Sequence, residues 1–170
     1  ILEECNLDLQ LGEPIFPHFS LPAGETPLDY LRSLCRKGLQ QRCGGDPGDR
    51  RWQRLKRELS IIDDLGFTEY FVFVRDILSY AREQNISTIG RGSGGSSIVS
   101  YALGITQVDP VEYDIPFERF LHSERKDLPD LDFDLCWKQR DQLIESIYER
   151  YGTDRVAMVS THNTFRLRSA

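Results

Sequence analysis

Residues 129–135, with the sequence PDLDFDL, alternate carboxylates with large apolar side chains. In an extended chain successive side chains point to opposite faces, and neighbours two positions apart share one face at a separation of about 6.6 Å. The pattern therefore predicts a strand whose apolar side chains face a core. The opposite face carries an acidic row that consists of Asp130, Asp132 and Asp134.

Carboxylates at this spacing repel one another unless a positive charge lies between them, and a divalent cation with oxygen ligands is the usual one. A solvent-facing strand would also alternate, but Asp is depleted in strands and a row of like charges is unfavourable. An EF-hand calcium loop is excluded, because its Gly and Glu positions are Leu135 and Asp141 here. The acidic row predicts a site for Mg²⁺, for which Mn²⁺ can substitute.

A glycine and serine run at residues 90–97 follows a short apolar segment and precedes a second one. A strand, a Gly-rich turn and a helix in this order present backbone N–H groups to an anion. The run is not a P-loop, since no Gly-Lys-Ser/Thr closes it, and it is not a dinucleotide fingerprint. A flexible connector stays open as an alternative, but the acidic row in the same chain favours a phosphate cradle.

Arg119 and Arg125 lie between the glycine run and the acidic row. A guanidinium binds phosphate oxygens through two parallel hydrogen bonds and keeps its charge at any relevant pH. For either arginine alone, an ion pair with Glu118 or Glu124 is the alternative. Together with the loop and the aspartates, the arginines indicate a triphosphate, and the combination predicts nucleotidyl transfer assisted by two metal ions.

The net charge of −6 would by itself argue against a nucleic-acid partner, because phosphate binding depends on Lys and Arg. Residues 31–60 nevertheless carry nine basic and three acidic side chains. A solvated helical surface and a nucleic-acid-binding face both stay open for this basic run. Its basic members are Arg32, Arg36, Lys37, Arg42, Arg50, Arg51, Arg54, Lys56 and Arg57.

No apolar run approaches the roughly 20 residues that a membrane span requires, and no signal segment opens the chain. A cytoplasmic setting without a membrane partner is therefore expected. The four cysteines show no metal-ligand spacing and are expected to be reduced thiols.

Apolar periodicity and capping residues predict the order of elements. Helices are expected at about 27–42, 49–65, 68–83, 98–103 and 137–152, and strands at 86–89, along the acidic row and at 156–159. The fold class is α+β. An irregular leader at 1–25 precedes a helical segment at 26–85, and a region with both helices and strands occupies 86–170.

Several ordered motifs resemble one known family. They are GRGS at residues 90–93, SYALGIT at 100–106, FERF at 117–120 and PDLDFD at 129–134. They look like the palm of the bacterial C-family DNA polymerases, the alpha subunit of DNA polymerase III. Residues 148–152 and 165–170 look most like the error-prone branch of that family. The resemblance implies that residues 86–170 form the first part of a palm of the polymerase-beta-like nucleotidyltransferase type, a mixed sheet with flanking helices.

The resemblance also implies roles for individual residues. Asp130 and Asp132 match the two motif aspartates that bind catalytic metal, and Asp134 matches a further metal-site position. The nucleotide-binding positions of the motifs are matched by Gly92, Ser93, Arg119 and Arg125.

The implied activity is transfer of a dNTP to a primer 3′-hydroxyl on a DNA template, in replication or repair, with other replisome or translesion subunits bound through regions outside this sequence. The family's third catalytic aspartate also lies outside it, so the chain alone is expected to be inactive. Two alternatives stay open: a smaller nucleotidyltransferase that acts on a non-DNA acceptor, and a non-catalytic binding module with a decayed site.

Overall fold

The computed structural model describes residues 19, 21–122 and 129–160. The chain divides into two compact units, Ile1–Asp134 and Leu135–Ala170. In chain order the elements are α1 (Pro27–Arg42), α2 (Asp49–Asp64), α3 (Thr68–Glu83), β1 (Thr88–Arg91), the 3₁₀ helix η1 (Gly92–Ser96), α4 (Ile98–Leu103), the 3₁₀ helix η2 (Phe117–Arg119), β2 (Asp132–Leu135) and α5 (Arg140–Tyr151).

The first four predicted helices are confirmed, and their ends follow local chemistry. At the start of α1, Thr26 accepts a hydrogen bond from the backbone N–H of Asp29 at 3.2 Å, and Pro27 occupies the first helical position. These contacts satisfy a donor that has no partner within the helix. The end of α4 is closed by Gly104 in a left-handed conformation, with φ of +73°.

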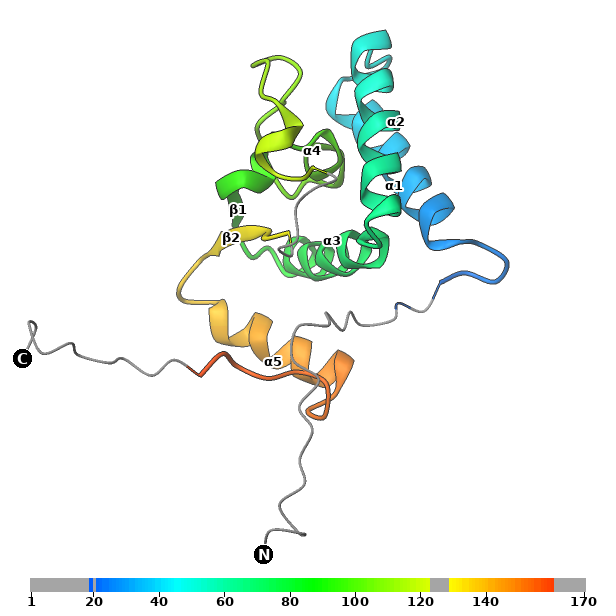
Figure 1. The fold of residues 1–170 in the computed structure, drawn as a ribbon. Helices are drawn as coiled ribbons and strands as arrows, with labels where there is room; N and C mark the ends of the chain where they lie inside the picture. The colour runs from blue at the N-terminus through cyan, green and yellow to red at the C-terminus, as the bar shows by residue number, and fades with distance from the viewer. Residues whose placement is uncertain (1–18, 20, 123–128, 161–170) are drawn as a thin grey trace, which may run out of the picture. The chain divides into compact units, whose positions relative to one another are not determined.

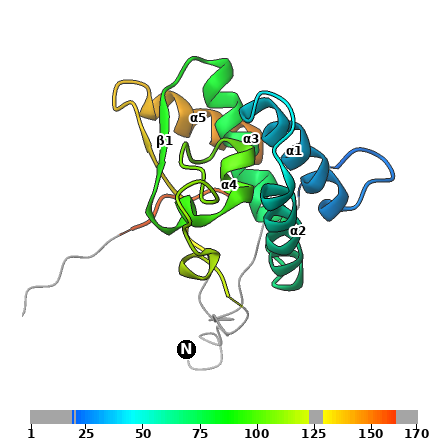
Figure 2. The same cartoon turned by 90° about the horizontal axis from the view of Figure 1, so that it is seen from above.

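Helices α1 to α4 form the core of the first unit. Figure 1 shows α1 and α2 side by side, and Figure 2 shows α4 beside them. The apolar stripes predicted for the helices point inward, since each of the four contributes side chains that are at most 1% exposed. Examples are Leu31, Leu39, Ile62, Phe71, Leu78, Ile98 and Val99. Burial of one such side chain stabilises the fold by about 1.5–3 kcal/mol.

Helix η2 is held on this core by aromatic side chains. Phe117 and Phe120 are fully buried, and their ring centroids lie 6.1 Å apart in an edge-to-face arrangement. Phe120 makes a second edge contact with Phe71 of α3, at 6.0 Å. Such pairs contribute about 0.5–1.5 kcal/mol beyond their buried area. They fix the backbone at Arg119, which lies between the two rings in sequence.

The sheet has two strands among the described residues, and β1 pairs with β2. Strand β1 begins at Thr88 rather than at the predicted Ile86. The reason is that Asn85 adopts a positive φ of 55° and the N–H of Ile86 bonds back to the carbonyl of Ala81 at 2.8 Å. Ile86 therefore completes the C-terminal cap of α3 and is not available to a strand.

Two predictions for the second unit need correction. The strand predicted at 156–159 is wrong, because this segment is not extended against any described strand, and Met158 and Val159 are exposed. A β-branched, apolar sequence needs a pairing partner before it forms a strand. Helix α5 begins at Arg140 rather than at Trp137, after a turn in which the N–H of Gln139 bonds to the carbonyl of Cys136.

The α+β class is confirmed by this mixture of helices and a small sheet. None of the helices in the described ranges is long and apolar enough to cross a membrane. The three cysteines that the structure describes, Cys35, Cys43 and Cys136, are free thiols, as predicted.

The packing of α1 on α4 predicts the effect of one substitution. A Cβ atom at Gly38 would lie 2.0 Å from the carbonyl oxygen of Ala102. Alanine is favoured over glycine in a helix by about 1 kcal/mol, but overpacking against backbone costs about 1–3 kcal/mol. We expect Gly38→Ala to lower the free energy of unfolding in urea denaturation. Gln40→Ala, at an exposed position of α1, serves as the control and should leave it unchanged or slightly raised.

Candidate functional site

The pairing of β1 with β2 brings the glycine run against the acidic strand. Gly92 has a φ of +71°, and a Cβ atom there would lie 2.9 Å from Oδ2 of Asp132. A Cβ atom at Gly94 would lie 2.8 Å from Cδ2 of Leu131. Only glycine combines this backbone conformation with so close an approach at little cost. The loop and the acidic row, predicted as separate features, are therefore neighbours.

Arg91, the last residue of β1, binds two of the three predicted aspartates. Its Nε donates to Oδ1 of Asp134 at 3.0 Å, and its Nη1 lies 3.8 Å from Oδ2 of Asp132. The Asp132 side chain is 35% exposed and that of Asp134 is 66% exposed. The guanidinium thus supplies part of the positive charge that the spacing of the carboxylates requires.

Asp130 precedes β2 and is exposed. Beside it, the backbone N–H of Leu131 donates to the hydroxyl of Tyr70, on α3, at 3.4 Å. Burial raises the pKa of Tyr70, and the negative charges of Asp130 and Asp132 raise it further. Tyr70 therefore lies within the field of both carboxylates and anchors the backbone that carries them.

The remaining predicted site residues are Ser93, Arg119 and Arg125. Ser93 follows Gly92 in η1 and is half-buried. Arg119 lies at the end of η2, which is a neighbour of η1, and its side chain is exposed. Its alternative partner, Glu118, forms an ion pair with Arg57 instead. Arg125 and Glu124 lie outside the described residues.

The donor set suits a hard divalent cation, because Asp130 and Asp132 offer carboxylate oxygens beside a loop from which glycine excludes side-chain atoms. Within the ranges that the structure describes, no three His, Cys, Asp or Glu side chains are gathered closely enough to hold a metal ion. The residues fit magnesium in chemical type, and the assignment of Asp130, Asp132 and Asp134 as metal ligands stays a prediction.

An ion pair with a fully buried carboxylate contacts the segment that follows the glycine loop. Glu58 of α2 is 0% exposed and accepts hydrogen bonds from Arg54 Nε at 2.5 Å and from Ser97 Oγ at 2.7 Å. Ser97 caps the start of α4 and immediately follows η1. The loop that carries Gly92 and Ser93 is therefore tied at its far end to α2.

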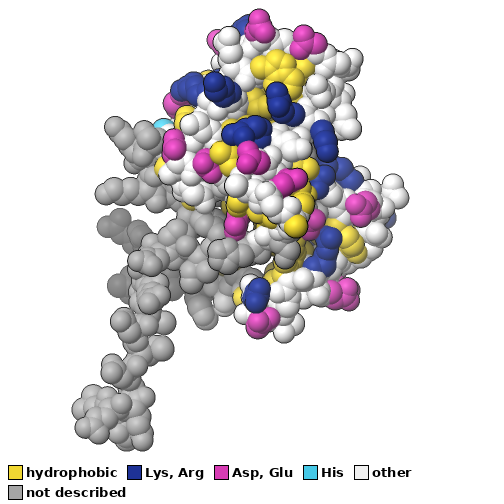
Figure 3. Space-filling view, turned by 90° about the vertical axis from the view of Figure 1, so that its right-hand side faces the viewer, with side chains coloured by type: hydrophobic (Ala, Val, Ile, Leu, Met, Phe, Trp, Pro, Cys, Tyr) yellow, Lys and Arg dark blue, Asp and Glu magenta, His cyan; other side chains and the backbone are white. Residues whose placement is uncertain are grey.

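The basic run of residues 31–60 is used largely within the fold. Five of its arginines reach residues more than 40 positions away, namely Arg42, Arg50, Arg51, Arg54 and Arg57. One example joins Arg51 Nε to Asp109 Oδ2 at 2.7 Å. On the face shown in Figure 3, Lys and Arg side chains are interspersed with Asp and Glu and do not form one continuous patch.

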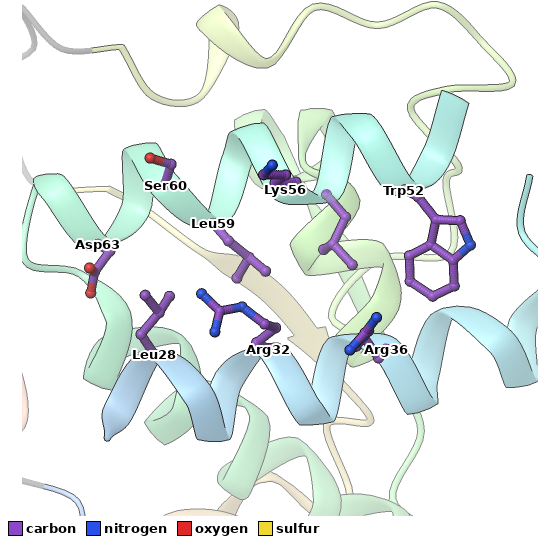
Figure 4. Close-up of a pocket in the computed structure, with 9 residues that line it drawn as sticks. Leu28, Arg32, Arg36, Trp52, Lys56, Leu59, Ser60 and Asp63 are labelled. Carbon is purple, nitrogen blue, oxygen red and sulfur yellow. The ribbon is translucent and has the colours of Figure 1, made fainter. Parts of the chain in front are cut away.

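Three other members of the basic run line a groove of about 580 Å³ between α1 and α2 (Figure 4). Its apolar side chains include Leu28, Trp52, Leu55 and Leu59, and its basic ones are Arg32, Arg36 and Lys56. None of the predicted site residues lines this groove. It is a separate feature from the loop and the acidic strand.

Sequence reasoning assigned no role to four residues of this site. Arg91 lies between two glycines in the GRGS motif at residues 90–93, and this position could have suggested a role in the site. Arg54 and Glu58 have the i, i+4 spacing of a helical ion pair, which could have been noticed. Tyr70 gave no signal, because an aromatic residue in an apolar helix is expected to belong to the core.

Comparisons with known proteins identify the relatives. The family model described as the bacterial DNA polymerase III alpha NTPase domain matches residues 29–170. The chain is 42% identical over 171 residues to a DNA polymerase III subunit alpha of Halalkalibacterium halodurans, and 41% identical over 174 residues to an error-prone DNA polymerase of Corynebacterium jeikeium. Each alignment covers 100% of this chain and 15% of the relative, so the chain spans about 15% of the length of these proteins.

The buried carboxyl of Glu58 predicts a pH dependence of stability. Burial raises its pKa from the ordinary 4.5 to about 7, although hydrogen bonds from Arg54 and Ser97 act in the opposite direction. Since the pKa is higher in the folded state, the stability contributed by this group is complete below pH 4.5 and is lost as the pH rises through about 7.

We therefore expect the free energy of unfolding of the wild-type chain to fall, relative to that of Glu58→Gln, as the pH rises from about 4.5 to 7. The relative change is on the order of 3 kcal/mol at most. Urea denaturation of both proteins at several pH values measures it. Parallel pH profiles would show that the carboxyl of Glu58 does not titrate differently in the folded state.

Proposed function

Because the chain belongs to the bacterial DNA polymerase III alpha NTPase domain family, we propose that it is part of a DNA-directed DNA polymerase. We further propose that it contributes the first part of a palm of the polymerase-beta-like nucleotidyltransferase type, beginning at residue 86. The whole protein would transfer a dNTP to a primer 3′-hydroxyl on a DNA template.

The observation that carries the proposal is the contact between the glycine loop and the acidic strand. A nucleotidyl transferase must hold the triphosphate and the carboxylates within a few ångströms of each other, because its catalysis depends mainly on positioning and electrostatics. Here Gly92 lies so close to Asp132 that a single added carbon would be 2.9 Å from Oδ2. The loop backbone is thus available to phosphate oxygens next to the carboxylates.

In this proposal Asp130 and Asp132 hold Mg²⁺, for which Mn²⁺ can substitute, and Asp134 contributes to the same acidic face. Bound magnesium would lower the pKa of the attacking hydroxyl and stabilise the leaving pyrophosphate. Arg91 limits the repulsion between Asp132 and Asp134 and orients both side chains.

The nucleotide-binding residues hold the triphosphate. Gly92 and Ser93 present backbone N–H groups and, at Ser93, a hydroxyl. Arg119 and Arg125 neutralise phosphate charge and hold the triphosphate beside the acidic face. The buried aromatic rings on either side of Arg119 support this role by fixing its backbone.

The proposed partners are a DNA primer–template, dNTPs, and replisome or translesion subunits that bind other parts of the whole protein, in the cytoplasm. Relatives named DNA polymerase III subunit alpha and error-prone DNA polymerase have similar identities, 42% and 41%. Assignment to the error-prone branch therefore stays a prediction, as does the inactivity of the chain alone. Family membership favours a polymerase over the smaller nucleotidyltransferase and the decayed binding module.

The proposal predicts that Asp132→Asn in the full-length polymerase lowers nucleotide incorporation by about 10²-fold or more, because a carboxylate that stabilises transition-state charge is lost. DNA affinity should change little, since basic residues dominate it. Primer extension and DNA binding measure the two effects. Asp114→Asn is the control, because this exposed aspartate has a positive φ of 52° that asparagine tolerates. Near-normal incorporation by Asp132→Asn would remove Asp132 from the mechanism.

A second prediction concerns the space between the loop and the carboxylate. Gly92→Ala in the full-length polymerase adds a Cβ atom that displaces Asp132 or the loop, so the rate of dNTP incorporation should fall. Gly44→Ala is a matched control, since Gly44 has a similar φ of +67° but nothing within 4 Å of the added carbon. Both variants place a side chain at a similar positive φ, and equal primer-extension rates would contradict the proposed contact.

A further inference from the structure

Two side chains of α2, the partly buried Arg54 and the fully buried Glu58, connect segments that carry the proposed nucleotide-binding residues. We propose that Glu58 and Arg54 are positioning residues that hold the glycine loop and the Arg119 segment in register for the triphosphate of the incoming nucleotide. The inference rests on the proposed function, and it assigns to an ion pair outside the site a role in nucleotide affinity.

Glu58 holds the far end of the loop through its second carboxylate oxygen. Oε2 accepts from Ser97 Oγ at 2.7 Å and from the backbone N–H of Val99 at 3.3 Å. Ser97 is the N-cap of α4 and Val99 lies in its first turn, directly after η1. Since Glu58 is 0% exposed, it cannot itself reach a substrate, and its effect must pass through the backbone that it holds.

Arg54 extends the connection to two further carbonyl groups. Its Nη2 donates to the carbonyl of Ser96 at 3.2 Å and to that of Ile115 at 2.9 Å. Ser96 is the last residue of η1, and Ile115 leads into η2, which ends at Arg119. The guanidinium also lies 5.9 Å from the ring centroid of Phe117. One ion pair therefore fixes the loop and η2 relative to each other.

This connection can matter for function because the opposite end of η1 lies close to the carboxylate of Asp132. Ser96 and Gly92 are the two ends of the same 3₁₀ helix, and Gly92 lies against Asp132. A displacement of the Ser96 carbonyl would move the loop across the carboxylate. A shift of about 1 Å in a positioning group can cost about 10²-fold in rate.

A contribution to the stability of the fold does not by itself explain why these two positions carry an ion pair. Replacing a buried ion pair by apolar residues of similar volume is often neutral or stabilising, because both charges lose their hydration. A planar guanidinium that serves one carboxylate and two separate carbonyl groups defines a geometry that apolar contacts would leave less constrained. The contacts thus favour a positioning role over a purely stabilising one.

Steady-state kinetics of the full-length Glu58→Gln polymerase test the inference, with the active fraction determined by active-site titration. We expect the KM for dNTP to rise at least about tenfold, with a smaller change in kcat and an unchanged dissociation constant for DNA. Asp64→Asn, which removes an exposed carboxylate from the same helix, should leave all three quantities unchanged. A lower active fraction with an unchanged KM for dNTP would overturn the inference, because it would indicate only impaired folding.

Arg54→Lys provides a second test in case Glu58→Gln folds poorly. Lysine keeps the positive charge beside Glu58 but cannot bridge the carboxylate and both carbonyl groups. We expect its KM for dNTP to rise as well, and the double variant to be no worse than the more impaired single variant. Fully additive effects, or a normal KM in Arg54→Lys, would contradict the inference.

The outcome separates the two proposals. If Asp132→Asn and Gly92→Ala impair incorporation while Glu58→Gln and Arg54→Lys keep a normal KM for dNTP, the positioning role alone is rejected. If Asp132→Asn retains normal incorporation, the proposed site itself is rejected.

Discussion

The architecture depends on close approaches that only glycine permits. A Cβ atom at Gly38 would meet the carbonyl of Ala102 at 2.0 Å, and one at Gly90 would meet the carbonyl of Ile105 at the same distance. The first contact joins α1 to α4, and the second places β1 against the segment that follows α4. The contact of Gly92 with Asp132 completes the series. Substitution of Gly38 or Gly90 would force backbone apart and separate elements that frame the candidate site, whereas at Gly92 the added carbon would meet the end of the Asp132 side chain.

Ion pairs and hydrogen bonds of charged side chains help to hold these elements together. The chain has a net charge of −6, yet many of its basic residues lie close together in sequence. In the fold these arginines are used as internal connectors. Arg51 binds Asp109, and Arg54 binds Glu58 together with two backbone carbonyl groups. Part of a basic run for which a solvated surface and a nucleic-acid-binding face were both open thus joins α2 to the segments around the loop.

The candidate site combines a rigid support with an exposed acidic edge. Glu58 is completely buried, whereas Asp130 and Asp134 are exposed and Asp132 is intermediate. Rigid backbone with accessible carboxylates is the arrangement that electrostatic catalysis requires, because the charges must not reorganise during the reaction. The chain belongs to the DNA polymerase III alpha NTPase domain family, and the proposed nucleotidyl transfer is a reaction for which this arrangement would be suited.

Sequence patterns by themselves determined the helices, the acidic strand and the residue types of the site. Helical periodicity and caps are local, so α3 was predicted from Thr68 to Glu83 as observed, and alternation identified β2, although β2 begins at Asp132 and leaves Asp130 outside the strand. Tertiary structure decided what those residues contact. That Arg91 lies between Asp132 and Asp134, that Glu58 holds Ser97, and that residues 156–159 lack a strand partner all depend on segments distant in sequence. Local pattern carries no information on such pairings, because they form only when the chain folds and buries one element against another.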